Sequence, residues 1–462
     1  MVDLVTSVVL SADSYKYSQF NQYPEGTEYV YSYISSRGGP WPETVVFGLQ
    51  YALKKFLARP VTREEVETAA LMMAAHGEPF NKEGWEHILM NHGGLLPVKI
   101  RAVPEGTRVP VGNVIMTITN TDPKCAWLVS FLETLLLRSV WYPTTVATNS
   151  YESKKIIKKY LEATGDPSLL GFKLHDFGFR GVSSLESGAI GGLAHLVNFM
   201  GTDTVGALVL GKQYYDADMA GFSIPAMEHS TVTSWGREGE EESFRNMLKQ
   251  YGKPGAILAC VSDSYNIYKA CELWGTKLKD EVIASGATVV IRPDSGEPSE
   301  VVLKCIQILE KYFGSTTNSK GFKVLNNVRV IQGDGIDHSS IHSILAVLYF
   351  SGYSADNVAF GQGGALLQKV DRDTMKFAMK CSAIGVNVGG SIEWRDVFKD
   401  PVTDQGKRSL KGRVELFKDS EGKYYTDVID YGSRSSELVT VFEDGKLFNT
   451  TTLDEVRARA AI

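Results

Sequence analysis

The stretch TVVIRPDSG at residues 288–296 is the most informative segment of this sequence. A short, mostly β-branched apolar run ends abruptly in a cation, a proline, a carboxylate and a glycine, which is typical of a buried strand followed by a polar turn. The pattern recurs from about residue 170 onward. Its other occurrences are FKLHDFGFR at 172–180, LVNFMGTD at 196–203, SIPAMEHS at 223–230, ILACVSDS at 257–264, VRVIQGDG at 328–335, NVAFGQGG at 357–364 and MKC at 379–381.

These repeated strand-then-turn segments predict the fold class. Strands that alternate with helical-period segments indicate a parallel sheet, and about eight of them suggest closure into a barrel whose chemistry lies at the carboxyl ends of the strands. We therefore expect an α/β protein with an irregular (β/α) barrel-like catalytic domain at 166-399. The flanks, 1-165 and 400-462, are expected to form a second, mixed α+β domain, with a helix at 64–75 and strands at 98–103, 114–118, 424–428 and 437–442.

Composition excludes several classes of protein. The 462 residues are 43% hydrophobic and 22% charged, which is ordinary globular composition, and the net charge of -6 argues against a protein that binds nucleic acid through bulk charge. The longest apolar stretch, 126–137, is interrupted by Glu133 and is too short to cross a bilayer. Residues 1–10 lack a basic region typical of a secretion signal, and five widely spaced cysteines suit reduced thiols. We expect a cytoplasmic protein without a membrane or nucleic-acid partner.

Two of the turns suit a phosphorylated sugar. Glycines at 361–364 precede a good helix start, so backbone N–H groups there could approach a phosphate, although the segment could equally be a plain turn between strand and helix. Arg292 and Asp294 follow one strand, and Asp334 lies between two glycines after the next. Carboxylates beside bare backbone suit the vicinal hydroxyls of a ribose; structural salt bridges are the alternative.

Two further turns carry aromatic and imidazole groups. Phe177, Phe179 and Arg180 would offer a flat surface beside a charge, on which a planar, electron-poor ring could stack, unless the aromatics belong to the core. His229 could be a base, a nucleophile or a buried structural imidazole. No H-E-x-x-H motif is present, no cysteine pair forms a zinc knuckle, and neither a G-x-S-x-G nor a P-loop motif is present, which disfavours metal-centred and hydrolase functions.

Taken together, the motifs resemble the nicotinamide phosphoribosyltransferase family. The resemblance covers nearly the whole chain. It rests on SADSYK at 11–16, VPEG at 103–106, WYPTTVATNS at 141–150, HDFGFRGVSS at 175–184, GTDTV at 201–205, EHST at 228–231, VSDSY at 261–265, IRPDSG at 291–296, QGDG at 332–335, LLQK at 366–369 and FKDP at 398–401.

The resemblance implies an activity and an assembly. Members join nicotinamide to phosphoribosyl pyrophosphate, release pyrophosphate and make nicotinamide mononucleotide for NAD salvage. They are homodimers whose active sites are shared between subunits. ATP is a co-substrate that phosphorylates a histidine, here His229, and Mg²⁺ is held mainly by the pyrophosphate, so we expect no direct side-chain ligand to it.

The resemblance also assigns residues. Phe177 and Tyr15 of the partner subunit would sandwich the pyridine ring, with Asp203 accepting from its carboxamide and Arg292 close by. The ribose would contact Asp294, Gly333 and Asp334, and its 5′-phosphate Gly363 and Gly364. Cations around phosphate and pyrophosphate would be Arg37, Arg180, Arg372, Lys380 and Lys399. The catalytic group would comprise His229, Asp263, Asp294 and Asp334.

Asp203 is the residue that bears on substrate choice. An ionised carboxylate repels the acid nicotinate but accepts a hydrogen bond from the amide, so it favours nicotinamide over the nicotinate used by the nearest rival family. A non-catalytic nucleotide sensor is the other alternative. Two departures from the family pattern are Ala378, where a serine is expected two residues before Lys380, and a segment around Arg37 that is shorter than in animal relatives.

Overall fold

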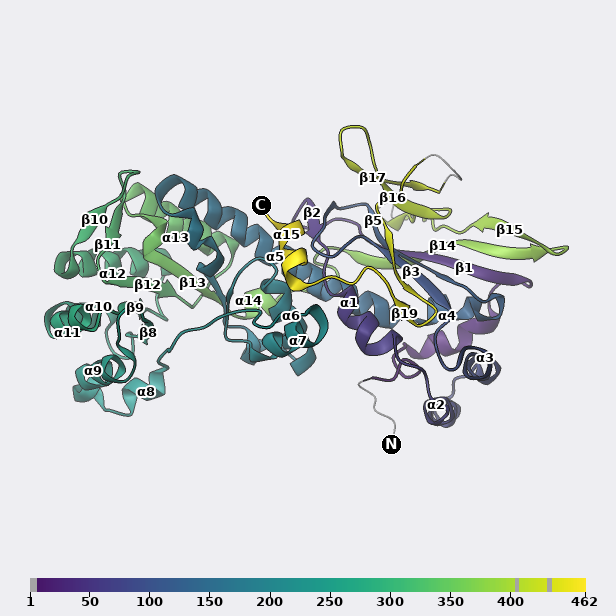
Figure 1. The fold of residues 1–462 in the computed structure, drawn as a ribbon, viewed down its shortest axis with the longest axis horizontal. Helices are drawn as coiled ribbons and strands as arrows, with labels where there is room; N and C mark the ends of the chain where they lie inside the picture. The colour runs from purple at the N-terminus through teal and green to yellow at the C-terminus, as the bar shows by residue number, and fades with distance from the viewer. Residues whose placement is uncertain (1–5, 404–406, 430–433) are drawn as a thin grey trace. The chain divides into compact units, whose positions relative to one another are not determined.

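The computed structural model describes residues 6–403, 407–429 and 434–462 (Figure 1). The chain divides into two units, each with its own sheet. Unit 1 comprises residues 1–148, 213–217 and 371–461, and unit 2 comprises 149–212, 218–370 and 462. The domain boundaries expected from the sequence, 1-165 with 400-462 and 166-399, stay a prediction.

Unit 2 is built on a six-stranded parallel sheet in the order β7-β6-β13-β12-β9-β8. Its strands are β6 (Leu174–Asp176), β7 (Gly201–Thr202), β8 (Ile257–Val261), β9 (Thr288–Arg292), β12 (Val328–Gln332) and β13 (Val358–Gln362). Val289, Ile291, Val328 and Val330 are fully buried, because helices and strands enclose both faces of these short apolar runs. The expected parallel α/β sheet is confirmed.

The two edges of this sheet are joined by an irregular segment. The Phe222 carbonyl accepts from Thr202 N–H at the β7 edge, and Ala259 N–H donates to the Pro225 carbonyl at the β8 edge. Each contact forms only an isolated parallel bridge. Proline has no N–H to continue a ladder, so the strand expected at 223–226 is reduced to these bridges, and the sheet curls without becoming a regular barrel.

Two other segments expected in the parallel sheet do not belong to it. Residues 196–199 follow the end of α6 (Leu185–His195) as a turn, where Leu196 N–H donates to the Gly192 carbonyl. Residues 379–381 do form a strand, but it lies within β14 (Phe377–Val388), which pairs antiparallel with β1 (Thr27–Ser36) in unit 1. A short apolar run does not reveal whether it is helix end or strand, nor which partner it will take.

Amphipathic helices cover the sheet of unit 2. In α12 (Pro298–Phe313) the buried positions Val302, Cys305, Ile306 and Leu309 recur with helical period, and Glu297 caps the first turn. The other helices and strands are α7 (Val205–Tyr215), α8 (His229–Thr233), α9 (Glu240–Tyr251), α10 (Ile267–Thr276), α11 (Lys279–Ser285), α13 (His338–Phe350), α14 (Gly364–Leu367), β10 (Ser315–Thr317) and β11 (Lys323–Leu325). α7 runs into the 213–217 segment of unit 1.

Unit 1 is built on a seven-stranded antiparallel sheet in the order β15-β14-β1-β5-β3-β18-β19. The N-terminal strands are β1, β3 (Val98–Ala102) and β5 (Val114–Asn120); β1 pairs with β14, and β3 pairs with β18 (Val439–Glu443). β15 (Ser391–Asp396) and β19 (Lys446–Leu447) extend the sheet by pairing with β14 and β18. The remaining elements are β2 (Glu43–Val45), β4 (Arg108–Pro110), β16 (Val414–Lys418), β17 (Tyr424–Val428), α1 (Leu49–Ala52), α2 (Arg63–His76), α3 (Lys82–His92), α4 (Ala126–Phe131) and α15 (Leu453–Ala460). The two flanks thus share one sheet, as expected.

Three further features bear on the expectations from composition. α5 (Glu133–Thr164) contains Pro143 and begins within the longest apolar stretch of the sequence. Within the described ranges, no helix combines the length and the apolar character needed to traverse a bilayer. All five cysteines are free, and four of them are buried.

Candidate functional site

A cavity of about 820 Å³ lies in unit 2 where the parallel strands end. The residues that line it follow β6, β7, β9, β12 and β13 or begin α8, so the sheet brings together positions far apart in the sequence. They are Phe177, Phe179, Arg180, Asp203, Glu228, His229, Ser230, Arg292, Asp294, Gly333, Asp334 and Gly363. Most of the site residues singled out between about residue 170 and residue 364 therefore face one space.

Phe177 is held in this cavity by its backbone and by two glycines. Its N–H donates to the Gln362 carbonyl at 2.9 Å. A Cβ on Gly361 would lie 1.9 Å from the ring, so only glycine leaves room for it, and a Cβ on Gly333 would lie 3.1 Å away. The Arg292 guanidinium carbon lies 5.3 Å from the ring centroid. The ring is thus a fixed platform with a cation at its face.

Asp176, which the sequence analysis passed over, shapes the turn that carries Phe177. Its fully buried carboxylate accepts from Gly178 N–H at 2.7 Å and from the Thr204 hydroxyl at 2.7 Å. Burial raises the pKa of Asp176, and these hydrogen bonds oppose that rise. The signal that could have found it is the Asp-x-Gly sequence, in which an aspartate commonly bonds the backbone two residues on.

Asp203 directly follows β7 and is held in place by two side chains. The Nε2 of His175 and the hydroxyl of Ser223 both lie 2.7 Å from its Oδ1. Burial raises the pKa of Asp203, but these hydrogen bonds and the charges of His175 and Arg292 outweigh it and keep the pKa below its ordinary value. Half of the side chain is exposed, so an ionised carboxylate is presented to the cavity with one oxygen already engaged.

His229 and Asp294 are linked through Asp263, which is itself almost fully buried. Asp263 Oδ1 lies 2.8 Å from His229 Nε2, while its Oδ2 accepts from Asp294 N–H at 3.1 Å and from the Ser295 hydroxyl at 2.6 Å. The imidazole is nearly half exposed. Because the carboxylate accepts from Nε2–H, the lone pair of the ring lies on Nδ1.

One nitrogen of the Arg292 side chain donates a hydrogen bond, and another has no hydrogen-bond partner in the described structure. Its Nη2 donates to Asp294 Oδ1 at 3.1 Å, whereas its buried Nε has no hydrogen-bond partner in the described structure. A Cβ on Gly333 would lie 3.4 Å from that Nε and 3.5 Å from the same Asp294 oxygen. A buried donor without a partner in the lining of a cavity is suited to a polar ligand.

The expected phosphate turn is open but does not begin a long helix. α14 is a single turn of four residues, so the macrodipole of a long helix is absent there. No atom lies within 4 Å of a Cβ position on Gly364, which leaves its backbone accessible. Arg180, on the neighbouring short helix Phe179–Gly181, is exposed, and Phe179 packs against Gly188 of α6. Phe177 and Phe179 therefore have different contacts: Phe177 packs against Gly361, and Phe179 packs against α6.

The remaining predicted cations gather within unit 1. Lys380 is half-buried in β14; burial lowers its pKa, Glu133 opposes that effect, and the charges of Arg37, Lys399 and Arg372 lower it further. A lysine whose pKa is lowered by three nearby cations lies in a cluster that suits a multiply charged anion. Tyr15, in the short helix Ser14–Asn21 of the same unit, is 58% exposed. Ala378, at the position of the expected serine, is buried in β14 and pairs with Ser35 of β1.

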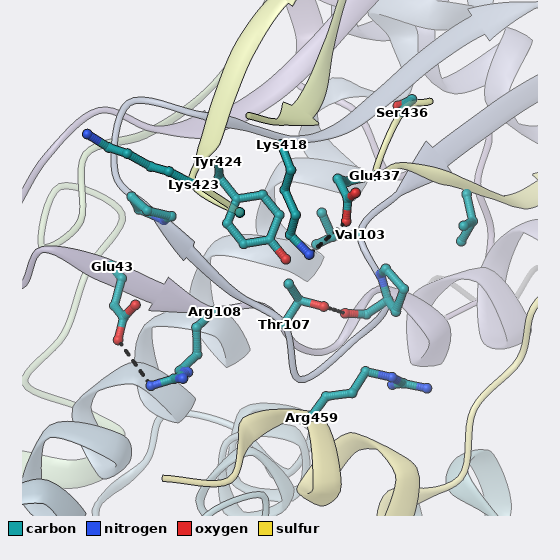
Figure 2. Close-up of a pocket in the computed structure, with 14 residues that line it drawn as sticks. Glu43, Val103, Thr107, Arg108, Lys418, Lys423, Tyr424, Ser436, Glu437 and Arg459 are labelled. Atoms are coloured by element: carbon teal, nitrogen blue, oxygen red, sulfur yellow. Dashed lines mark hydrogen bonds and ion pairs between the residues drawn. The ribbon is translucent and has the colours of Figure 1, made fainter. Parts of the chain in front are cut away.

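Unit 1 also has a cavity of its own, of about 700 Å³, between the β16–β17 hairpin and the turn before β4 (Figure 2). Two of its cationic side chains bind groups of the same unit. Lys418 pairs with Glu437 at 3.1 Å, and Arg459 donates to the Glu105 carbonyl and to Thr451. Lys418 and Arg459 are therefore engaged by groups of the same unit.

Two relatives with similar sequences are both described as nicotinamide phosphoribosyltransferases. A nicotinamide phosphoribosyltransferase from Xanthomonas campestris pv. campestris is 56% identical over 98% of both chains, and one from Acinetobacter baylyi is 34% identical over 97% of this chain and 96% of its own. The chain belongs to the nicotinamide phosphoribosyltransferase family. The model of that family's N-terminal domain matches residues 7–100, and the model of the nicotinate phosphoribosyltransferase family matches 172–445.

Solved structures support the fold assignment of this family member. A nicotinate-nucleotide pyrophosphorylase from Pyrococcus furiosus covers 98% of this chain and 94% of its own with a TM-score of 0.63 at 15% identity. Human nicotinic acid phosphoribosyltransferase covers 97% and 92% with a TM-score of 0.57 at 16% identity. The fold shared with them is that of the type II phosphoribosyltransferases, in which a curled parallel sheet accompanies an antiparallel sheet from the two terminal regions.

Proposed function

We propose that this protein is a nicotinamide phosphoribosyltransferase, a pentosyltransferase of NAD salvage. It transfers phosphoribosyl from phosphoribosyl pyrophosphate to nicotinamide, giving nicotinamide mononucleotide and pyrophosphate. The observation that carries this proposal is the 56% identity across essentially the whole of both chains, combined with an ionised Asp203 beside an aromatic platform.

The pyridine ring of nicotinamide lies against Phe177, and its carboxamide donates to Asp203. Stacking suits an electron-poor ring, and Arg292 lies at the same face. Since His175 and Ser223 occupy Oδ1 of Asp203, the other oxygen is the acceptor for the amide N–H₂. Tyr15 of the partner subunit closes the other face of the ring.

Phosphoribosyl pyrophosphate lies across the same cavity. Asp294 and Asp334 accept from the ribose hydroxyls, Gly333 allows the sugar to approach the backbone, and Gly363 with Gly364 contacts the 5′-phosphate. The cations that surround the phosphate and pyrophosphate are Arg37, Arg180, Arg372, Lys380 and Lys399. Mg²⁺, held mainly by the pyrophosphate, supplies further neutralisation of the leaving group when bound.

The reaction breaks the bond between ribose C1 and pyrophosphate and forms a bond between C1 and the pyridine nitrogen. Positive charge grows on the ribose as the anion leaves, so catalysis stabilises both ends: carboxylates near the sugar and cations around the pyrophosphate. Phe177 holds the nitrogen in line for attack. The attacking nitrogen carries no proton, and no general base is needed.

His229 couples ATP hydrolysis to this reaction. The hydrogen bond from Nε2 to Asp263 leaves Nδ1 as the nucleophile for the γ-phosphoryl group of ATP, and the buried carboxylate stabilises the charge that the ring acquires. Asp263 also holds the Asp294 turn, so a phosphorylated imidazole is linked to the ribose site through one carboxylate.

The direct test measures mononucleotide formed by purified protein from phosphoribosyl pyrophosphate with nicotinamide or nicotinate, each with and without ATP and Mg²⁺. We expect nicotinamide mononucleotide as the main product and a gain with ATP. Preferential use of nicotinate would assign the protein to the rival activity. Absence of turnover with both bases would support a nucleotide sensor instead.

The protein is proposed to be a homodimer with active sites that use both subunits. Tyr15 is exposed and aromatic, which supports a role in a partner's site. Inactive Tyr15→Ala and inactive Asp203→Ala subunits, mixed and allowed to exchange, should recover part of the activity. Verified heterodimers that stay inactive would contradict shared sites.

We place the protein in the cytoplasm and without a nucleic-acid partner. Five free cysteines, four of them buried, suit a reducing compartment, and the net charge of -6 opposes binding to a polyanion. Fractionation of cells followed by the mononucleotide assay tests the location.

A further inference from the structure

Two histidines and an aspartate meet in unit 1, in a group of residues with no role in the reaction above. Nε2 of His87 and Nε2 of His92 lie 2.7 Å and 2.6 Å from the same oxygen, Oδ2 of Asp122. Across the described ranges 6–403, 407–429 and 434–462, this is the one group of three or more His, Cys, Asp or Glu whose ligand atoms all lie within 4.8 Å of one another.

The group is held in place from two elements. His87 and His92 project from the second half of α3, five residues apart, and Asp122 precedes the short helix Pro123–Cys125. The other carboxylate oxygen of Asp122 accepts from Lys124 N–H at 2.9 Å. That bond fixes the orientation of the carboxylate and leaves Oδ2 directed at the two rings.

The surroundings also suit ligands that are partly shielded from water. The three side chains are 17%, 26% and 18% exposed, so the group is accessible from one side only. The side-chain amide of Asn91 lies 3.0 Å from Nδ1 of His87. Rotation of that amide presents its oxygen to Nδ1–H, the outer contact that orients a metal-bound imidazole.

We propose that His87, His92 and Asp122 form a binding site for a divalent transition-metal ion, with Zn²⁺ as the favoured occupant. Two imidazoles and one carboxylate are a frequent zinc ligand set, and water fills the fourth position where such a site is open. Hard ions such as Mg²⁺ and Ca²⁺ prefer oxygen ligands and are disfavoured by the two nitrogens.

Little movement is needed to admit the ion. Zinc ligands at about 2.0–2.1 Å in tetrahedral geometry are roughly 3.3 Å apart. Each imidazole nitrogen therefore moves away from Oδ2 by about half an ångström, which small changes of side-chain torsion provide. Each ring then carries its proton on Nδ1, so that the Nε2 lone pair faces the ion. The ion would join α3 to the turn before α4.

The test uses the full-length, untagged protein without phosphoribosyl pyrophosphate or Mg²⁺, so that no metal is bound through substrate phosphates. Zn²⁺ affinity is measured by competition with a chromophoric chelator, and Co²⁺ serves as a spectroscopic probe. We expect one ion per chain, Co²⁺ absorption bands of the intensity typical of four-coordinate geometry, and a higher Tm with Zn²⁺.

Three variants locate the site. His92→Gln and Asp122→Asn should each weaken Zn²⁺ binding at least about tenfold and abolish the Co²⁺ bands. Asn still accepts from Lys124 N–H, so Asp122→Asn keeps the local cap. His76→Gln is the matched control, because His76 ends α2 and contacts Ser14 instead of this group. Absence of stoichiometric Zn²⁺ binding, or binding that both ligand variants leave unchanged, would overturn the proposal.

Discussion

The Nε2 of His175 lies 2.7 Å from Oδ1 of Asp203, the carboxylate assigned to the carboxamide of the substrate. His175 is the middle residue of β6, and Asp203 directly follows β7, the neighbouring parallel strand. The sheet therefore holds a hydrogen-bonded pair at the point where substrate selectivity is expected. Ser223, from the segment that joins the sheet edges, adds a second bond to the same oxygen.

Asp203→Ser should collapse the preference for nicotinamide over nicotinate. The substitution removes the repulsion of the acid and a charge-assisted hydrogen bond to the amide worth roughly 1.5–3 kcal/mol, which is on the order of a ten- to hundredfold loss. The measurement is kcat/KM for both bases, with Asp203→Asn as the isosteric neutral control. A selectivity ratio that stays at the parent value in a folded variant would place discrimination elsewhere, with Arg292 as the next residue to test.

His175→Gln and Ser223→Ala should affect the same selectivity indirectly, by loosening Asp203. Each removes one hydrogen bond to a carboxylate, so we expect KM for nicotinamide to rise about five- to tenfold with a smaller change in kcat. A double-mutant cycle with Asp203→Asn checks the mechanism. Additive effects would mean that neither residue acts through Asp203.

Gly361→Ala should displace the Phe177 ring, because the added Cβ would lie 1.9 Å from it. We expect a fall in nicotinamide affinity and a loss of stability of about 1–3 kcal/mol from overpacking. Gly181→Ala is the matched control, since the nearest atom to its Cβ position is 3.9 Å away. Equal nicotinamide affinity in the two folded variants would show that the ring is free to move or is not the platform.

His229→Ala should abolish ATP hydrolysis and the ATP-dependent gain in mononucleotide synthesis, and leave slow ATP-independent transfer. Asp263→Asn should impair the same coupling, since it weakens the bond that sets the imidazole tautomer. Assays of phosphate release and mononucleotide formation in parallel distinguish coupling from bond making. Hydrolysis at the parent rate in His229→Ala would refute the assignment.

His195 should make stability fall with acid. It is fully buried in α6, where it bonds Ser150 and the Leu174 carbonyl, and burial lowers its pKa to about 3 from an ordinary 6.5. Between these values the unfolded chain binds a proton that the folded chain does not. The contribution of His195 to the free energy of unfolding is therefore fully present above pH 6.5. It falls by about 1.4 kcal/mol per pH unit below that pH.

Urea unfolding at pH 7, 6 and 5 measures this slope, and His195→Gln should remove that part of it while exposed His76→Gln leaves it in place. An NMR titration adds a direct readout, because the His195 ring should stay neutral at pH 5. A ring that titrates near its ordinary pKa in the folded protein would contradict the prediction.

Much of the parallel sheet could be predicted from local pattern. Runs such as 288–291 and 328–331 are short, β-branched and bounded by glycine or charge, and each forms a buried strand, because such side chains fit a sheet enclosed on both faces. The polar residues that follow them line a common cavity, since parallel strands end at one edge.

What only the tertiary structure decided is which distant groups meet. MKC at 379–381 has the same local pattern as the barrel strands, yet its strand pairs antiparallel with β1, because hydrogen-bond partners across a chain are chosen by packing. His175 with Asp203, and His87 with Asp122, are 28 and 35 residues apart in sequence and carry no mutual signal there. The sequence by itself gives the type of side chain at each position. A set of metal ligands, or a carboxylate fixed by hydrogen bonds, forms only when folding brings those positions within hydrogen-bond distance.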